Sequence, residues 1–518
     1  MRTFTGILLA VVAAVIAAPA FAVPPPSNAN AVNVTATWNH VERVSDTIPT
    51  TQHLASAYTL RSNPLNKPLL KALRDLHTQD TRLQLWYTVP RQAVAELKEP
   101  TATETFWNFK YIDPLFSDFY ANTSGRRHVN FGTIPRWMFE VPPIDVPIDP
   151  GASFHAYAKG TTGALLKDPS GQQFAAYQVR IYKWYTQGGF TDEIGKYHRS
   201  GHHYKISYWD VLNEPDFENK ITVEQYTKIY DAVTQAIHKI DANVQFFGPE
   251  ISGAEVPWAR YFLNPKNHAP GALPVEWFSF HNYVDAPNDP ATWQARYFTG
   301  QPSSATDGAP AQALVGRIQH VLKIRDELSP KTKVIIDELG TFNLVKPGED
   351  ACSAVEPYRA YKPLYWVAIG ANWADNFITA EKLGSPIFSM SQLLGYPTQC
   401  LSITMVNWDT AHPNAHYWVL KLINDNFGPG DKLVRTESSS PDVVAQASIT
   451  RSGRKLLLVN TSDRTVTVDL SNSYRGAGLG AEVVDEASGE QPPRNEQVMK
   501  QHITLAPFAT AVVSQATK

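Results

Sequence analysis

Two glutamates, Glu214 and Glu338, stand in similar sequence contexts and have the chemistry of a catalytic carboxyl pair. Glu214 lies near the end of residues 206–216, ISYWDVLNEPD, and Glu338, 124 positions later, near the end of residues 333–340, KVIIDELG. Both runs are typical of buried strands, and Pro215 would end the first one where its glutamate projects. A protonated carboxyl can donate to a leaving oxygen, and an ionised one can attack a carbon. Two strand-end carboxylates are the minimum equipment for glycoside hydrolysis.

The surrounding segments have the pattern of βα units that would position this pair. The candidate strands are residues 83–87, 129–132, 206–212, 244–248, 277–281, 334–337 and 387–390. After Glu214, Thr222 and Gln225 have capping-box spacing, and apolar residues then recur on one helical face. Such alternation over about 400 residues favours an α/β fold, a (β/α)8 TIM barrel with insertions. A doubly wound sheet is the alternative, but no nucleotide fingerprint supports it.

The pattern changes near Leu433 to short alternating segments. Residues 465–470, TVTVDL, alternate with period two, and turn clusters such as residues 460–463, NTSD, separate the runs. These features predict a C-terminal antiparallel β-sandwich domain. The predicted organisation is a signal peptide at 1–22, a catalytic barrel at 23–432 and a β-sandwich accessory domain at 433–518.

The first residues predict export. Arg2 precedes an apolar stretch at residues 7–18, and residues 20–22, AFA, form a small-residue cleavage site. The stretch is shorter than the roughly 20 residues of a membrane span. We expect cleavage after Ala22 and a soluble protein that is secreted or periplasmic.

Two cysteines, Cys352 and Cys400, remain after the predicted cleavage. An oxidising destination permits them to pair, and their expected places in neighbouring loops after the seventh and eighth strands favour a disulfide bond. Two separate buried thiols are the alternative.

The composition points away from several classes of partner. The formal charge is −3 and no basic run occurs, so neither nucleic acid nor an anionic membrane surface is expected as a partner. Aromatic residues make up 11% of the chain and include 13 tryptophans, which suits stacking on sugar rings as well as packing in a large core. No motif calls for a metal or an organic cofactor, and the sequence does not determine an oligomeric state.

Several short motifs occur around Glu214 in a recognisable order. They are residues 107–113, WNFKYID; 131–135, FGTIP; 248–250, GPE; and 277–283, WFSFHNY. This order resembles the retaining glycoside hydrolases of clan A, and most of all glycoside hydrolase family 39, which includes β-xylosidases and α-L-iduronidases. Leu339 and Gly340, after the second glutamate, instead resemble other clan members such as family 5.

The resemblance implies roles for individual residues. Glu214 would be the general acid/base and Glu338 the nucleophile of a retaining enzyme. Asn213 would hydrogen-bond the sugar's 2-hydroxyl, a contact able to strengthen as the oxocarbenium ion forms. Tyr283 would orient the nucleophile and help keep it ionised.

Other residues have competing interpretations. His281 either lines the sugar site or is a satisfied core histidine. Trp137 and Trp408, after the third and eighth strands, either stack on sugars or pack in the core. Glu250, at the end of the fifth strand, is a candidate substrate contact. Strand alternation predicts that Asp337 points away from the barrel axis.

Together these observations predict a secreted retaining glycoside hydrolase that cleaves plant or microbial polysaccharide or oligosaccharide by double displacement. A β-xylosidase-like exo action is favoured. The alternatives are an endo-acting clan A glycanase and a non-catalytic carbohydrate-binding barrel, although the presence of both glutamates argues against the latter.

Overall fold

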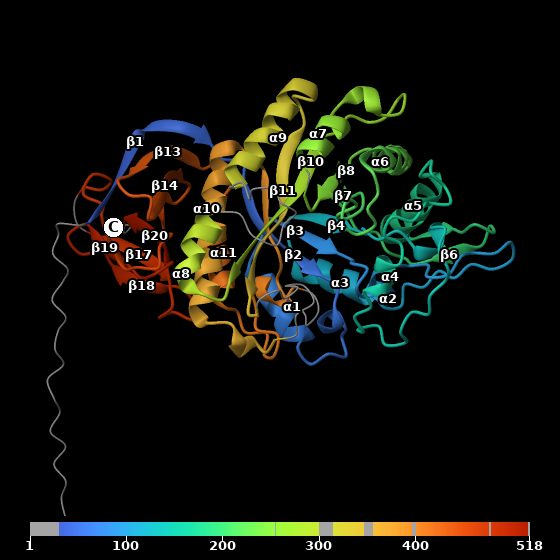
Figure 1. Ribbon diagram of the computed structural model, residues 1–518, viewed down its shortest axis with the longest axis horizontal. Coiled ribbons are helices and arrows are strands. Elements are labelled where there is room, and N and C mark those ends of the chain that lie inside the picture. The colour runs from blue at the N-terminus through green and yellow to red at the C-terminus, as the bar shows by residue number, and fades with distance from the viewer. Residues whose placement is uncertain are drawn as a thin grey trace, which may run out of the picture.

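The computed structural model describes residues 31–253, 255–299, 314–346, 356–395, 400–475 and 478–515. Within these residues the chain forms a parallel β-barrel wrapped by helices and a β-sandwich beside it (Figure 1). The predicted leader at 1–22 and Cys352 lie outside the described residues, so the signal peptide and the disulfide remain predictions.

The barrel sheet begins and ends at one segment of the chain. Its two outermost strands, β8 (Gln245–Phe247) and β9 (Pro249–Ile251), are separated only by Gly248, so the sheet closes into eight strand positions. The strands between them are β7 (Tyr208–Asp210), β4 (Arg126–Asn130), β3 (Asp80–Gln84), β2 (Ile48–Leu54), β12 (Ile387–Met390), β11 (Lys333–Leu344) and β10 (Trp277–Pro287). All neighbouring pairs are parallel, which confirms the predicted (β/α)8 barrel.

Helices follow the barrel strands and cover the sheet. The longer ones are α1 (Asn66–Asp75), α3 (Ile112–Asn122), α5 (Gln172–Thr186), α6 (Val223–His238), α7 (Glu255–Phe262), α9 (Leu314–Leu328), α10 (Pro363–Leu383) and α11 (Ala415–Asn426). Short ones are α2 (Pro90–Ala93), α4 (Ala156–Lys159), α8 (Pro290–Trp293), a π-helical turn (Gln294–Phe298) and 3-10 turns (Ala57–Thr59, Arg136–Met138, Pro265–Asn267, Tyr358–Ala360, Leu401–Ile403). A hairpin of β5 (Gly189–Thr191) and β6 (Tyr197–Arg199) follows α5. Helix α6 begins as predicted, because the Thr222 side chain accepts a hydrogen bond from the Gln225 N–H.

The barrel interior has an apolar layer and a polar layer. Tyr208, Phe247, Trp277, Ile335 and Ile387 form a separate apolar cluster inside the barrel. The polar layer explains why two strands were misplaced or missed in the sequence. Strand β3 begins three residues before the predicted run at 83–87, and β2 was not predicted, because polar residues occupy many of their buried positions.

The second domain is built from both ends of the described chain. Its sheet order is β18-β17-β20-β15-β14-β13-β1-β16-β19. The strands are β13 (Lys432–Ser438), β14 (Val443–Thr450), β15 (Gly453–Asn460), β16 (Val466–Asp469), β17 (Leu479–Val484), β18 (Arg494–Gln497), β19 (His502–Leu505) and β20 (Thr510–Gln515), together with β1 (Val32–Val44). All neighbours are antiparallel except β1 and β16, which are parallel.

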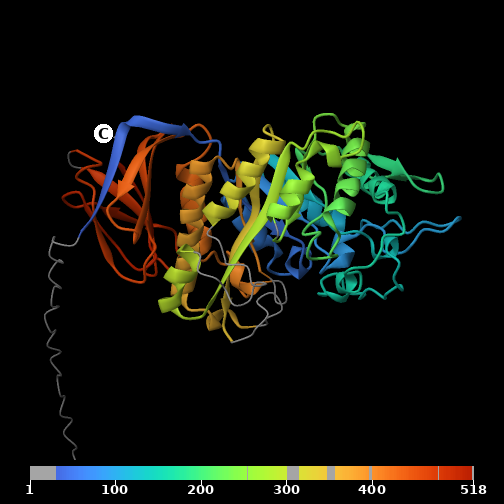
Figure 2. The same cartoon turned by 45° about the horizontal axis from the view of Figure 1, so that its top comes forward.

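Strand β1 corrects the predicted domain limits, which placed residues 23–432 in the barrel. It pairs with β13 and, at Val32 and Asn33, with β16. Val32, Val34 and Ala36 are buried in the core of the sandwich, which explains the pairing. Figures 1 and 2 show this blue strand lying among the red and orange strands of the C-terminal domain. The pairing joins residues about 400 positions apart, so no local pattern in the sequence predicts it.

The sandwich and the barrel share one apolar core. Leu457, Val484 and Phe508 belong to the same cluster of buried residues as the barrel helices. The Phe508 ring is fully buried, with ring centroids 6.0 Å from those of Trp293 and Phe298. A shared apolar core of this kind favours unfolding of the two units together.

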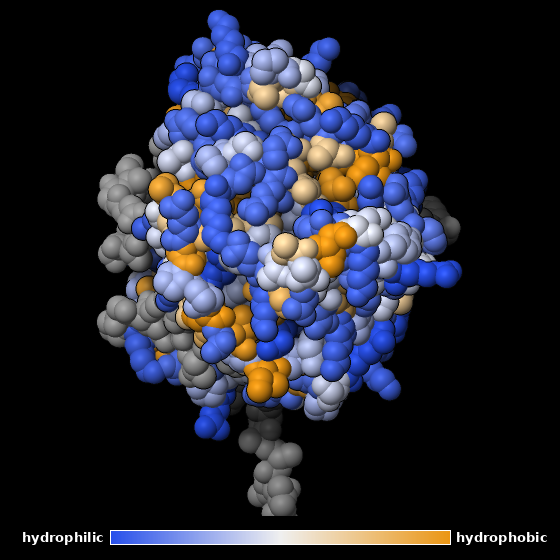
Figure 3. Space-filling model, turned by 90° about the vertical axis from the view of Figure 1, so that its right-hand side faces the viewer, coloured by the Kyte–Doolittle hydropathy of each residue, from blue (hydrophilic) through white to orange (hydrophobic). Residues whose placement is uncertain are grey.

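The outer surface is mostly hydrophilic on the face that Figure 3 shows, where apolar residues form small patches separated by polar ones. Among the described residues, no helix combines the length and the apolar character needed to cross a bilayer.

Candidate functional site

Glu214 projects from a strained turn directly after β7. Its φ is 40°, in the left-handed region, and Leu212 has φ 68°. The Glu214 N–H donates to the Glu250 carbonyl over 2.9 Å, which ties this turn to the neighbouring strand. A Cβ at Gly132 would lie 2.8 Å from the Asn213 Cβ, so only glycine lets the chain pass there. Backbone strain of this kind persists where the surrounding structure fixes it, as at functional sites.

Glu338 reaches the site through a β-bulge in β11. Phe280 pairs with Ile336, but the next residue, His281, pairs with Glu338, so Asp337 is the extra residue. Asp337 is fully buried and its Oδ1 lies 3.6 Å from His281 Nε2. It therefore faces the barrel interior, and the prediction that it points away from the axis is wrong because the bulge interrupts simple alternation.

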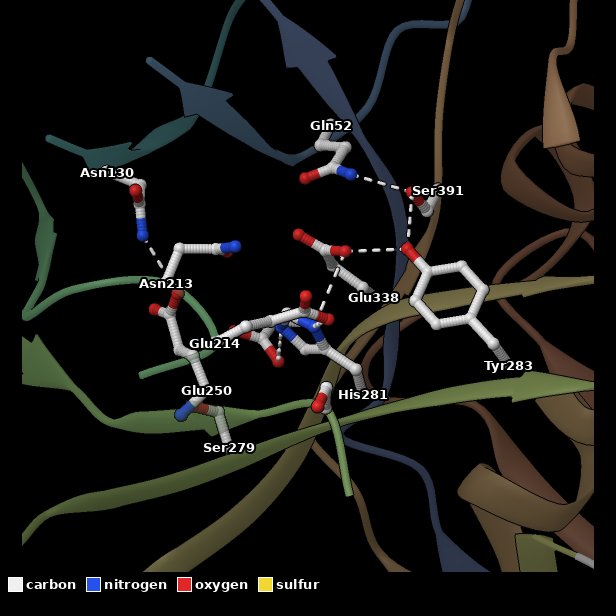
Figure 4. A network of polar contacts seen from close by, with 12 residues as sticks. Gln52, Asn130, Asn213, Glu214, Glu250, Ser279, His281, Tyr283, Glu338 and Ser391 are labelled. Atoms are coloured by element: carbon white, nitrogen blue, oxygen red, sulfur yellow. Dashed lines mark hydrogen bonds and ion pairs between the residues drawn. The ribbon is translucent and has the colours of Figure 1, made fainter. Parts of the chain in front are cut away.

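His281 on β10 links the two glutamates. Its Nδ1 lies 2.7 Å from Glu214 Oε1 and 3.4 Å from Glu338 Oε2 (Figure 4). One carboxyl oxygen of each glutamate and one His281 nitrogen all lie within 4.8 Å of one another. Carboxyl groups of retaining glycosidases are about 5 to 5.5 Å apart, whereas inverting enzymes need about 6.5 to 9.5 Å to admit a water. An oxygen–oxygen approach within 4.8 Å is shorter than the inverting range and favours the retaining geometry.

The local environment separates the pKa values of the two glutamates. Burial raises the pKa of Glu214 above its ordinary value, and the hydrogen bond from His281 only partly offsets this. Burial also acts to raise the pKa of Glu338, but the positive charges of His281 and Arg82 and the Tyr283 hydrogen bond outweigh it and lower this pKa. Burial acts to lower the pKa of His281, yet the negative charges of Glu338 and Asp337 raise it to about 9. At neutral pH these directions suit a protonated Glu214 and an ionised Glu338.

A closed ring of hydrogen bonds holds Glu338. The Tyr283 hydroxyl donates to Glu338 Oε2 over 2.6 Å and lies 2.9 Å from Ser391 Oγ. Gln52 Nε2 donates to Ser391 Oγ over 2.7 Å, and Arg82 Nη1 donates both to Gln52 Oε1, over 2.7 Å, and to Glu338 Oε1. Because the only Tyr283 proton goes to the carboxylate, Ser391 must donate to Tyr283. Figure 4 shows Tyr283 between Glu338 and Ser391.

Arg82 on β3 organises the polar layer under the site. Its side chain is fully buried and donates five hydrogen bonds, as many as the guanidinium has N–H groups. Besides Gln52 and Glu338, it donates to Asp210 over 3.0 Å, to Asn213 over 2.9 Å and to Glu250 over 2.5 Å. A planar guanidinium can satisfy five acceptors at once, whereas an ammonium cannot.

Comparisons with known proteins agree with this geometry. The sequence profile of glycosyl hydrolases family 39 matches residues 194–354, which contain both glutamates, and that of the D-apionate lactonase C-terminal immunoglobulin-like domain matches residues 441–513. A β-xylosidase from Geobacillus stearothermophilus is 23% identical over 195 residues, which cover 37% of this chain and 34% of that protein. The chain thus matches about a third of the relative's length.

Solved structures of glycosidases share the fold over nearly the whole chain. The family 51 α-L-arabinofuranosidase from Thermotoga petrophila has a TM-score of 0.57 at 14% identity and covers 93% of this chain and 99% of its own. The family 30 endoxylanase from Clostridium papyrosolvens has a TM-score of 0.52 at 12% identity and covers 93% and 100%. The chain is thus similar to family 39 glycosyl hydrolases over residues 194–354, and it shares the fold of the family 51 and family 30 enzymes.

Three residues that the sequence assigned to the site lie around the pair. Asn213, His281 and Tyr283 are all within one or two hydrogen bonds of Glu214 or Glu338. His281 is fully buried, so it contacts the carboxyls and not open solvent. The sequence left two roles open for His281 because it ends an apolar strand. In the structure it is both buried in the barrel and bonded to the site.

Glu250 differs from its predicted place at the substrate surface. Its side chain is fully buried, and its Oε2 accepts hydrogen bonds from Arg82 and, over 2.8 Å, from Asn130. Burial raises the pKa of Glu250 well above its ordinary value. Glu250 therefore belongs to the support beneath the site, where no atom is open to a ligand.

The two candidate tryptophans differ in burial. Trp408 is 4% exposed and packs in the core, with its ring edge-on to Tyr358 and Tyr361, so the stacking role predicted for it is not supported. Trp137 is half-buried and donates from its indole N–H to the Glu96 carbonyl over 2.9 Å. Cys400 is buried, and its predicted partner Cys352 lies outside the described residues.

Buried histidines and carboxylates in the described residues gather in three groups that could hold a metal ion. They are His128, Asp210 and Glu250; Glu214, His281 and Glu338; and Glu250, His281 and Asp337. Arg82 forms an ion pair with a carboxylate of each group, namely Asp210, Glu250 and Glu338.

Sequence reasoning missed Arg82, Ser391 and Glu218, which hydrogen-bond predicted residues. It also missed Gln52 and Trp86, which hydrogen-bond members of that first set. Two of them carried a usable signal. Arg82 is a charged residue within an otherwise strand-like run, and Glu218 follows Glu214 by one helical turn. A buried charge in such a place is rare unless it is paired.

Proposed function

We propose that this protein is a retaining glycoside hydrolase in which Glu338 is the nucleophile and Glu214 the general acid/base. The observation that carries the proposal is that carboxyl oxygens of the two glutamates lie within 4.8 Å of one another, bridged by His281. The opposite directions of their pKa shifts support the same assignment, because burial raises the pKa of Glu214 while nearby positive charges lower the pKa of Glu338.

The chemistry proceeds in two displacements. An ionised Glu338 oxygen attacks the anomeric carbon while Glu214 gives its proton to the leaving glycosidic oxygen, and a glycosyl ester forms. The ionised Glu214 then takes a proton from water as the water oxygen attacks the same carbon and releases Glu338. Two inversions give net retention, and both carboxyls return to their starting states.

The proposed substrate is a neutral glycoside of plant or microbial origin, with a β-xyloside tested first and exo action favoured. The β-xylosidase relative supports this choice. The segment between β4 and α5 also supports a pocket, because it borders the turn after Glu214, where the Thr162 hydroxyl donates to the Glu218 carbonyl and Asn219 donates to the Thr161 hydroxyl. We also propose that the protein is exported, on the strength of the leader pattern at residues 1–22.

The test is aglycone release from aryl β-xyloside, β-glucoside, β-galactoside, α-arabinoside and α-iduronide, with Glu338→Ala in parallel. We expect release from a neutral sugar, a loss of more than about 10³-fold in the variant and retention in a product-anomer NMR assay. Inversion would overturn the mechanism. No aglycone release from the aryl glycosides together with cleavage of polysaccharide would identify an endo enzyme. Binding of glycans without cleavage would support the non-catalytic barrel and refute the proposal.

A further inference from the structure

A third carboxyl, Glu218, faces the catalytic pair from the turn after Glu214. The Glu218 N–H donates to the Glu214 carbonyl over 2.8 Å, and the Thr162 hydroxyl donates to the Glu218 carbonyl over 3.2 Å. On the other side of the turn, the Asp216 carboxylate accepts hydrogen bonds of 3.1 Å from the backbone N–H groups of Ser252 and Gly253. The turn is thus fastened on both sides, which fixes the direction of the Glu218 side chain.

The Glu218 carboxyl bonds two groups next to the site. Its Oε1 accepts one hydrogen bond from Asn213 Nδ2 and one from Trp86 Nε1, each of 2.7 Å. The residue is 5% exposed. Burial and the negative charge of Glu214 raise the pKa of Glu218 well above its ordinary value. Either protonation state leaves Oε1 able to accept both N–H groups.

Arg82 and Glu218 together determine the orientation of the Asn213 amide. Arg82 Nη2 donates to Asn213 Oδ1 over 2.9 Å, while Asn213 Nδ2 donates to Glu218. Flipping the amide would place its NH2 against the guanidinium and its oxygen against the Glu218 oxygen, so both partners oppose the flip. Among the described residues, Asn213 Nδ2 donates to Glu218 alone, which leaves its second N–H for a ligand.

We propose that Glu218 is a positioning residue that holds the Asn213 amide so that its second N–H meets the 2-hydroxyl of the bound sugar. The inference rests on the proposed function, since it needs a glycoside in the site. A hydrogen bond to the 2-hydroxyl strengthens as charge develops at the anomeric carbon, so an amide fixed beforehand favours the transition state over the bound substrate. Glu218 itself touches no reacting atom in this arrangement.

The test compares an aryl glycoside with its 2-deoxy analogue, using wild type, Glu218→Ala, Glu218→Gln and Trp86→Phe. For wild type we expect removal of the 2-hydroxyl to lower kcat/KM about 100-fold or more. Glu218→Ala should lower kcat/KM for the normal substrate about 10- to 100-fold. It should change kcat/KM for the 2-deoxy analogue less than about threefold, because that analogue already lacks the hydroxyl that the Asn213 amide binds. Glu218→Gln keeps an oxygen for both N–H donors and should retain the wild-type ratio. Trp86→Phe removes only the other donor and should also retain this ratio.

Two outcomes would overturn the inference, and they are distinguishable. If wild type is active but Glu218→Ala lowers kcat/KM equally for both substrates, the residue has a general structural role and the coupling to Asn213 fails while the proposed function stands. If wild type releases no aglycone from any glycan or glycoside, the proposed function fails and this role fails with it. Thermal melting of each variant shows whether it is folded, and Glu218→Gln keeps the comparison informative if Glu218→Ala does not fold.

Discussion

The Tyr283 hydroxyl donates a 2.6 Å hydrogen bond to Glu338 Oε2, from the strand next to the one that carries the glutamate. This bond stabilises the ionised carboxylate, and it is one of the interactions that lower the pKa of Glu338. A fall in pH protonates Glu338 and would remove the proposed nucleophile. The acidic limb of the activity profile therefore reports the pKa of Glu338, and the basic limb reports loss of the Glu214 proton.

Tyr283→Phe should raise the pKa of Glu338 and shift the acidic limb towards higher pH. We expect kcat to fall about 10- to 100-fold at the optimum, because the bond to a charged group is lost. The measurement is kcat/KM against pH for both proteins. An unchanged acidic limb in the variant would show that Tyr283 does not control the ionisation of Glu338.

Arg82→Lys should be harmful despite conserving charge. An ammonium has three donors, so at least two of the acceptors Gln52, Asp210, Asn213, Glu250 and Glu338 lose their partner in a buried layer. We expect kcat/KM to fall more than about 100-fold and the free energy of unfolding to fall by about 3 kcal/mol. Denaturant unfolding and kinetics would check both effects. Arg61→Lys, at an exposed ion pair with Asp118, is the matched control and should be nearly silent. If Arg82→Lys kept the wild-type kcat/KM and free energy of unfolding, the five guanidinium bonds would not be needed for activity or stability.

Uronides should be poor substrates. Three carboxyls, Glu214, Glu218 and Glu338, surround the site, and the positive side chains beside them in the described residues, Arg82 and His281, are fully buried. The internal stretches outside the described residues contain no lysine or arginine. An aryl β-glucuronide should have a kcat/KM at least about 100-fold below that of the β-xyloside, because it places a negative charge among carboxyls. The β-glucoside is the neutral control for added bulk. A glucuronide cleaved faster than the glucoside would refute this electrostatic selection.

The sandwich should unfold together with the barrel. Phe508→Ala removes a fully buried ring at the shared core and should lower the free energy of unfolding by about 3 to 5 kcal/mol. Calorimetry should show one transition with a lower midpoint. Met499→Ala, at a position 70% exposed in the sandwich, is the control and should leave the midpoint unchanged. Two separate transitions, with the barrel unaffected, would show that the domains are independent.

The part of the site predicted from sequence is the part marked by apolar strands. Glu214 and Glu338 stood out because buried runs precede them. His281 ends a third such run, and the role of Tyr283 followed from the resemblance of residues 277–283 to family 39. Strand β2 lacked this apolar signal and β3 carried it only at its end, since their buried positions hold residues such as Gln52 and Arg82. A rule that seeks apolar periodicity therefore overlooks the strands that build the polar layer.

Other features depend on partners that are distant in the sequence. The pairing of β1 with β13 places the N-terminal strand in the sandwich, and no local signal indicates that partner. The bulge at Asp337 lets Asp337 face the interior beside Glu338, and it is visible only in the register with β10. The burial of Trp408 depends on Tyr358 and Tyr361, which precede it by about 50 residues.

The most direct test of the central claim is to trap the glycosyl-enzyme. A 2-deoxy-2-fluoro glycoside with a good leaving group, built on the sugar that the aryl panel identifies, should slow the second displacement and leave the sugar bound to the protein. Mass spectrometry of the intact protein and its peptides should show one sugar, attached to Glu338, and none in Glu338→Ala. A label on any other residue, or an active enzyme that never acquires a label and yields inverted product, would contradict the assignment of Glu338 as the nucleophile.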